Sequence, residues 1–227
     1  MSTPVMGALG NKGHKMRKVD EANTEAKRTT ILRAAIRCFN KFGLQNASIQ
    51  DICREAGMRS GHLYYYYPSK DAIIEEMCLM GTEELVDRID HMLDTRDIVS
   101  AVVDIHQEAE EGRQKWEITP ALRLELAAET TRNERLRDID EDQTARFAEA
   151  ARRAVSRARE EGKLNSKLDP AHFVDIVMLL WFGIGWRRIE RDFDLERYRE
   201  AFALLFEPWL LEPKKLAKSK KTTRAKA

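Results

Sequence analysis

The chain has 227 residues, which is enough for one large or two small domains with a substantial core. Hydrophobic residues make up 43% of it and charged residues 34%, a balance typical of a globular and mainly helical protein. The sequence has no apolar run of a signal peptide and no stretch of about 18 uninterrupted apolar residues, so we exclude a membrane protein and expect a cytoplasmic one.

The formal net charge of +1 conceals an uneven distribution of charge along the chain. Residues 1–70 hold 12 Lys and Arg against 5 Asp and Glu, residues 71–211 hold 20 against 32, and residues 212–227 hold 7 against 1. This asymmetry predicts a nucleic-acid-facing N-terminal part and an acidic body. Residues 1–24 and 212–227 are expected to form a disordered basic arm and tail, which either follow a DNA backbone or are simply solvated.

The first helix is expected to begin at Thr24 or Glu25 and to end at Phe42, because Gly43 follows it. Its buried stripe has helical spacing and comprises Ile31, Leu32, Ala35, Phe39 and Phe42. These apolar groups need partners from the segment that follows, so we expect a compact three-helix unit.

A second helix is predicted to begin after Ser48. Ser48 and Asp51 have the spacing of a capping box, and Ile49, Ile52, Cys53 and Ala56 recur on one helix face. Gly57 offers the left-handed conformation that ends a helix.

A third helix follows after a short turn. Ser60 is expected to cap it over residues 61–67, with Leu63 and Tyr67 facing inward, and Pro68 prevents its continuation. Two helices joined by a tight turn within residues 48–67 are typical of a helix-turn-helix. Its outward face carries hydrogen-bonding groups suited to reading DNA: Ser60, His62, Tyr65 and Tyr66.

The order of parts from about Lys27 to Val86 is specific. A first helix ends in F-G, then comes S-I-Q-D-I-C-R-E-A-G, then L-Y-x-Y-Y at 63–67 and S-K-D at 69–71. In this order the segment resembles the N-terminal domain of TetR-family transcriptional regulators. The resemblance implies base or backbone contacts with DNA from Gln50, Arg59, Ser60, Gly61, His62 and Tyr65. It implies phosphate contacts from Ser48, Tyr64, Tyr66 and Lys70.

The rest of the chain is predicted to be helical as well. A fourth helix is expected to run from Ser69 to Met92 or Leu93 and to link the two domains mechanically. Later starts and stops are marked by caps, prolines and a glycine: Ile98, Thr119-Pro120, Asn133 to Gly162, Asp169-Pro170 and Leu195 to Leu211. We therefore expect an all-α protein of about nine helices, with a DNA-binding domain at 25–86 and a ligand-binding and dimerisation domain at 87–211.

The last two predicted helices are too apolar for one protomer to cover. The first of them is hydrophobic on nearly every side between Phe173 and Trp186, and the second is broadly apolar. This pattern predicts a homodimer, and the resemblance implies the same. The expected interface residues are Phe173, Val177, Trp186, Phe202, Leu205 and Trp209.

Methionine and aromatic side chains in the body suit an adaptable apolar pocket, and equally a plain core. The candidates are Met77, Met80, Trp116, Met178, Trp181 and Phe182. The resemblance implies a small-molecule effector without naming it.

The predicted function is a sequence-specific transcriptional regulator, a repressor that an effector releases from a palindromic operator. The alternative is an α-helical enzyme or small-molecule-binding module with an incidental helix-turn-helix. No nucleotide-binding, serine-hydrolase or zinc-protease motif occurs, so we expect no enzyme and no cofactor. The pairs His106 with Glu110 and His172 with Asp175 offer too few ligands to predict a metal.

Overall fold

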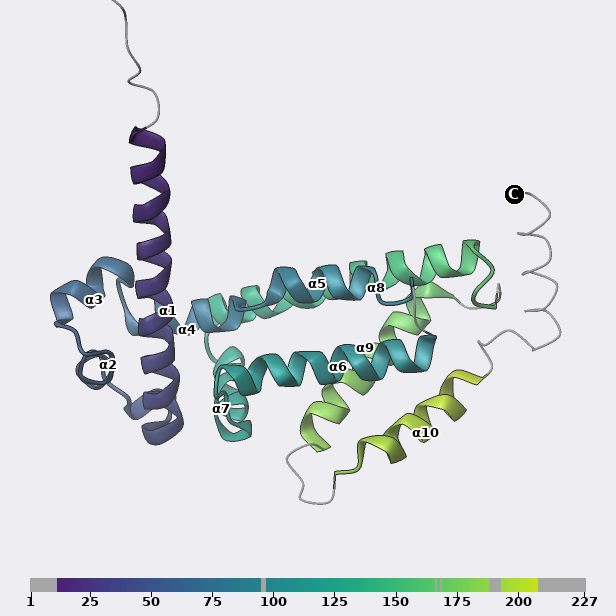
Figure 1. Ribbon diagram of the computed structural model, residues 1–227. Helices are drawn as coiled ribbons and strands as arrows, with labels where there is room; N and C mark the ends of the chain where they lie inside the picture. Colours follow the sequence, from purple (N-terminus) through teal and green to yellow (C-terminus); the bar gives the residue numbers. More distant parts are fainter. Residues whose placement is uncertain (1–11, 95–96, 166, 168, 188–192, 208–227) are drawn as a thin grey trace, which may run out of the picture. The chain divides into compact units, whose positions relative to one another are not determined.

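The structure is a computed structural model that describes residues 12–94, 97–165, 167, 169–187 and 193–207, with the backbone alone at 12–20, 181–182 and 185–186. The regular elements in these ranges are the helices α1 to α10, without a strand (Figure 1). The all-α class expected from the sequence is confirmed. By their contacts the helices form two units: an N-terminal unit, Met1–Cys78 with Trp116–Ala128, and a C-terminal unit, Leu79–Lys115 with Glu129–Ala227.

The N-terminal unit contains α1 (Lys12–Asn46), α2 (Ile49–Ala56), α3 (Ser60–Tyr66) and most of α4 (Lys70–Leu79) and α7 (Pro120–Thr130). Helix α1 begins earlier than the expected Thr24 or Glu25. Residues 14–26 contain neither proline nor glycine, so no local signal stops the helix from extending toward the N-terminus. At its other end Gly43 interrupts the helix as expected, with a φ of 81°.

The capping box of α2 is confirmed. Ser48 Oγ accepts from the Asp51 amide at 3.2 Å, and the Asp51 carboxylate accepts from the Ser48 amide at 3.0 Å. Gly57 ends the helix with a φ of 65°. These short-range bonds fix where α2 begins and ends.

The start of α3 differs from the prediction. Its N-cap is Arg59, and Ser60 is already the first residue of the helix. The Ser60 hydroxyl accepts from Cys53 Sγ of α2 at 3.7 Å, so it is turned toward α2 instead of the free amides of its own helix. The inward positions Leu63 and Tyr67 are buried as expected.

Side chains from α1, α2, α3 and α4 fill the core of this unit. Its fully buried residues include Ile31, Ile36, Phe39, Ile52, Leu63 and Ile73. The expected stripe of α1 is confirmed except at Phe42, which is 39% exposed and lies directly before the interruption at Gly43. Packing of α1 against α2 and α3 makes the predicted three-helix unit (Figure 1).

Tyr67 is the largest fully buried side chain of this core. The guanidinium of Arg28 lies over its ring, 4.4 Å from the centroid, and its hydroxyl has no hydrogen-bond partner among the described residues. Burial raises the pKa of the Tyr67 hydroxyl. An unsatisfied buried hydroxyl opposes folding.

Tyr67→Phe is therefore expected to raise the free energy of unfolding by about 1 kcal/mol, because the ring contacts stay and the unsatisfied hydroxyl goes. Urea unfolding followed by circular dichroism measures the change. Tyr64→Phe is the control, since that side chain is 49% exposed and its hydroxyl is solvated. A loss of stability in Tyr67→Phe would show that the buried hydroxyl is satisfied.

The C-terminal unit contains α5 (Thr82–Asp90), α6 (Ile98–Lys115), α8 (Glu134–Glu160), α9 (Pro170–Arg187) and α10 (Leu195–Phe206). Helix α5 runs along α8, which also packs on α9, while α10 packs on α6 (Figure 1). The predicted starts at Ile98 and Asp169-Pro170 are confirmed. The expected end of the last helix, Leu211, lies outside the described residues.

The expected continuous fourth helix is wrong. It is divided into α4 and α5 at Gly81, which has a φ of 75°. The Thr82 hydroxyl donates to the Leu79 carbonyl at 2.9 Å, which satisfies an acceptor at the end of α4. Apolar residues keep helical spacing on both sides of Gly81. The sequence pattern therefore did not indicate that the helix is interrupted there.

Helices α5 and α8 are joined by a charged cluster at the end of α5. The Asp90 carboxylate accepts from Arg153 at 2.9 Å and from Arg157 at 2.7 Å. Burial would raise the pKa of Asp90, but these hydrogen bonds hold it below its ordinary value. The cluster fixes the position of α5 on α8.

Aromatic side chains from α9 and α10 pack in the core of the C-terminal unit. Phe173 and Phe206 have ring centroids 5.6 Å apart, and Phe202 lies 6.4 Å from Phe206. All three are buried within the protomer. Within the described residues, no helix is both long and apolar enough to cross a bilayer.

Candidate nucleic-acid interface and ligand cavity

The solvent face of α3 is aromatic and polar. Tyr65 is 79% exposed, and His62 is exposed beside it. The Tyr66 ring lies edge-on to both, with centroids 5.3 Å from His62 and 5.1 Å from Tyr65. These ring contacts join His62, Tyr65 and Tyr66 into one cluster on the face of α3.

The ten expected DNA-contacting residues belong to α2, the turn after it, α3 and the start of α4. Six of them are exposed: Gln50, Arg59, Gly61, His62, Tyr64 and Tyr65. Four are half-buried: Ser48, Ser60, Tyr66 and Lys70. The structure thus brings them together in one unit, although Ser48, Ser60 and Lys70 also have partners within the protein.

Lys70 holds the last turn of α1, after Gly43, and the residue that follows the helix. Its Nζ donates to the carbonyls of Leu44 at 2.8 Å, Gln45 at 3.2 Å and Ala47 at 3.2 Å. An ammonium has three protons, and these bonds use all of them. A phosphate contact from Lys70 requires at least one of these bonds to be exchanged.

Arg28 positions the end of α3 and was missed in the sequence. Its guanidinium donates to the Tyr66 carbonyl at 3.1 Å and to the Glu76 carboxylate at 2.7 Å. It therefore ties α1 to both α3 and α4. Its position three residues before Ile31 puts a charged group on the buried face of α1, but the sequence does not show which groups it binds.

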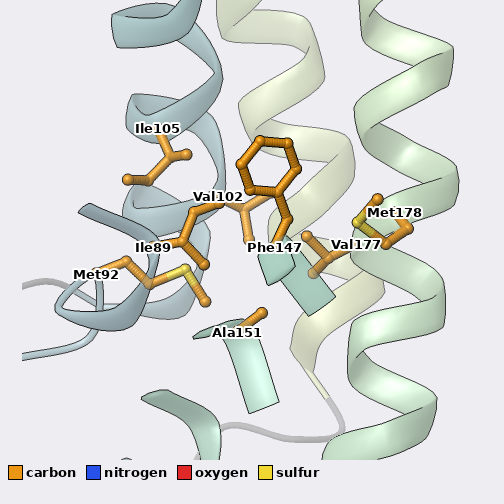
Figure 2. Close-up of a pocket in the computed structure, with 8 residues that line it drawn as sticks. All are labelled: Ile89, Met92, Val102, Ile105, Phe147, Ala151, Val177 and Met178. Carbon is orange, nitrogen blue, oxygen red and sulfur yellow. The ribbon is translucent and has the colours of Figure 1, made fainter. Parts of the chain in front are cut away.

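In the C-terminal unit, the described side chains that line a cavity are all apolar, and Figure 2 shows them gathered around a common space. They come from α5, α6, α8 and α9 and from the residues just after α5. The lining residues are Ile89, Met92, Val102, Ile105, Phe147, Ala151, Val177 and Met178. These side chains present only carbon and sulfur atoms and carry no charged group. The cavity therefore favours an apolar molecule.

Of the four expected pocket residues whose side chains the structure describes, only Met178 lines this cavity. Met77 is buried in the N-terminal unit, and Met80 is half-buried outside the lining. Trp116 lies under Arg33, whose guanidinium is 4.5 Å from the ring centroid. The side chains of Trp181 and Phe182 lie outside the described residues.

Burial within the protomer corrects the expected dimer interface at Phe173 and Phe202. Phe173 and Phe202 belong to the core, because α9 and α10 turn these positions inward. Val177 is half-buried and lines the cavity. Leu205 is 41% exposed. Among the described residues of these helices, the other large apolar side chains that are exposed are Leu179 at 74% and Leu204 at 73%. The side chains of Trp186 and Trp209 lie outside the described residues.

The two histidine–acid pairs considered from the sequence have other surroundings. His106 is buried, and Glu110 accepts from Arg113 at 2.9 Å. His172 lies 3.7 Å from Asp169. Among the described side chains, no group of three or more His, Cys, Asp or Glu is placed to hold a metal ion.

Comparison with known proteins points to one family. The profile described as "Bacterial regulatory proteins, tetR family" matches residues 31–77, which include α2, α3 and most of α4. UidR of Escherichia coli (strain K12), an HTH-type transcriptional regulator, is 26% identical over 174 residues, or 73% of this chain and 84% of UidR. The repressor KstR2 of Rhodococcus jostii is 24% identical over 174 residues, or 74% of this chain and 83% of KstR2.

The fold is also similar to that of solved structures. A regulator from Saccharomonospora viridis, solved in complex with choline, superimposes with a TM-score of 0.65 at 22% identity over 83% of this chain and 99% of that one. The helix-turn-helix with its exposed α3, the matching profile and these regulators agree. Residues 31–77 match the tetR-family profile, and the similarity to these HTH-type regulators supports DNA-binding transcriptional regulation as the function of this chain.

Proposed function

We propose that the protein is a homodimeric repressor that leaves a palindromic operator when an uncharged, apolar effector enters the cavity of the C-terminal unit. The observation that carries this proposal is the wholly apolar lining of that cavity. In this proposal residues 25–86 bind DNA, and residues 87–211 hold the effector and the dimer interface. The basic termini at 1–24 and 212–227 have no assigned role.

The DNA contacts proposed for this chain follow the exposed surface of the helix-turn-helix. Base or backbone contacts come from Gln50, Arg59, Ser60, Gly61, His62 and Tyr65, and phosphate contacts from Ser48, Tyr64, Tyr66 and Lys70. Phosphate contacts fix the register of a protein on DNA, while contacts with base edges specify the sequence. Exposure of His62 and Tyr65 supports the second role for them.

Dimerisation is supported by exposed leucines on α9 and α10. Leu179 and Leu204 are about three-quarters exposed and Leu205 is 41% exposed, although all three are apolar. A twofold dimer buries the same patch on both protomers and presents two α3 helices to successive major grooves. An operator with two symmetric half-sites follows from this symmetry.

Repression and effector release rest on the relatives and on the cavity. KstR2 is named a repressor, and the regulator from Saccharomonospora viridis holds choline. Choline carries a fixed positive charge, whereas the lining here contains no carboxylate that would pair with one. The effector proposed for this chain is therefore neutral and apolar.

Ala151→Leu tests the cavity as the effector site, because three added carbons fill space that an effector would occupy. The probe is N-phenyl-1-naphthylamine, a neutral apolar fluorophore. We expect the unmodified protein to bind it with a rise in fluorescence and to lose affinity for its selected DNA duplex. Ala151→Leu should bind the duplex normally and should not respond to the probe.

Ala145→Leu is the matched control, since the same atoms are added to an exposed position of α8. It should behave as the unmodified protein does. Equal probe binding by Ala151→Leu would place the probe elsewhere. A probe that occupies the cavity without weakening duplex binding would contradict effector release.

A further inference from the structure

The segment Trp116–Ala128 is held against the end of α1 within the N-terminal unit. The Glu125 carboxylate of α7 accepts from the Leu44 amide at 2.6 Å. Asn40 donates to the Glu117 carbonyl at 2.7 Å and accepts from the Thr119 hydroxyl at 2.7 Å. Glu117 has a φ of 61°, a conformation that is costly for a side-chain-bearing residue and is held here by the bond from Asn40.

Gly43 permits the close approach of Glu125. A Cβ added at Gly43 would lie 3.2 Å from Glu125 Oε2, and the φ of 81° at this position also disfavours any other residue. Space and backbone conformation thus agree that the end of α1 is shaped to receive this carboxylate. The bond is charge-assisted, which makes it stronger than a bond between neutral groups.

The residues that follow Gly43 are held from two directions. Glu125 binds the amide of Leu44, while the ammonium of Lys70 binds the carbonyls of Leu44, Gln45 and Ala47. The negative carboxylate therefore meets an N–H group, and the positive ammonium meets C=O groups. Ser48, the N-cap of α2, comes directly after this turn.

We propose that Glu125 is a positioning residue for DNA binding. By fixing the Leu44 amide it fixes the turn 44–47, and the turn sets the start of α2 and the carbonyls that hold Lys70. Glu125 touches no DNA in this account. Without the Glu125 carboxylate the turn is free to move. DNA binding must then order it, and this cost lowers the affinity. The preferred bases do not change.

Glu125→Ala is expected to weaken binding to the selected duplex about tenfold, the usual worth of a hydrogen bond to a charged group. Whether affinity falls or rises separates a positioning role from a simple effect of charge. Removing a negative charge from a DNA-binding unit reduces repulsion from phosphates and should by itself strengthen binding. Glu125→Gln loses the same charge but keeps an oxygen that accepts the Leu44 N–H. Its affinity for the duplex should therefore be no more than about twofold weaker than that of the unmodified protein.

Hydrogen exchange of the DNA-free protein supplies a readout that needs no operator. The Leu44 amide should exchange faster in Glu125→Ala and at nearly the original rate in Glu125→Gln. The control is Glu141→Ala, an exposed glutamate of α8 in the C-terminal unit, which should change neither the Leu44 exchange nor the preferred bases. Duplex binding by Glu125→Ala that equals or exceeds that of the unmodified protein would overturn the proposal, as would an unchanged exchange rate at Leu44.

Discussion

Phe202→Asp is expected to prevent the C-terminal unit from folding. Phe202 is 3% exposed and lies between the rings of Tyr198 and Phe206. Loss of a buried phenylalanine costs about 3–5 kcal/mol, and an unpaired carboxylate in the core adds to that cost. Because domains have a total stability of about 5–15 kcal/mol, circular dichroism should show a large loss of helix.

Leu204→Asp is the matched variant two positions away on α10. Leu204 is 73% exposed, so the same charge remains in water when the protomer folds. If α9 and α10 form the dimer interface, this variant keeps its helical content, sediments as a monomer and loses specific DNA binding. A folded, monomeric Phe202→Asp protein would contradict the assignment of Phe202 to the protomer core.

His62→Ala is expected to relax base preference at one position in each half-site. His62 is exposed on α3, and its ring is held edge-on to Tyr66. A good contact with a base edge contributes about 1–3 kcal/mol of discrimination, so the preferred base should lose about tenfold or more of its advantage there. Competition binding with duplexes that differ at single positions measures this change.

Tyr64→Phe is the control for that experiment. Its hydroxyl is proposed to contact phosphate, which carries no sequence information. This variant should weaken binding to all duplexes alike. Uniform weakening by His62→Ala would count against base reading by His62.

The N-terminal unit could be predicted in detail because its signals are short-range. Ser48 and Asp51 lie three residues apart and exchange the bonds that start α2. Gly57 ends it through its own backbone conformation. The prediction failed at Ser60, where a contact with Cys53 on another helix competes with local capping.

The cavity could not be predicted from residue type. Methionine and tryptophan occur both in cores and in pockets, and only the packing of four helices decides which positions surround a space. Met178 lines the cavity, whereas Met77 and Trp116 belong to the other unit. Val177 was expected at a dimer interface for the same reason, since an all-apolar helix does not indicate which face meets which neighbour.

The positioning residues were also beyond sequence reasoning. Arg28 and Glu125 act on backbone groups of Tyr66 and Leu44, which are 38 and 81 residues away along the chain. A charge that satisfies a distant backbone group leaves no periodic pattern. Such residues become visible only when the helices are in place.

Selection of DNA from a random pool with the full chain tests the central claim most directly. The unmodified protein is expected to enrich an inverted repeat whose half-site centres are about one helical turn apart or a multiple of it. His62→Ala should enrich the same repeat with one degenerate position in each half. Enrichment of no sequence, or of a single asymmetric site bound by one protomer, would contradict a twofold regulator that reads DNA through α3.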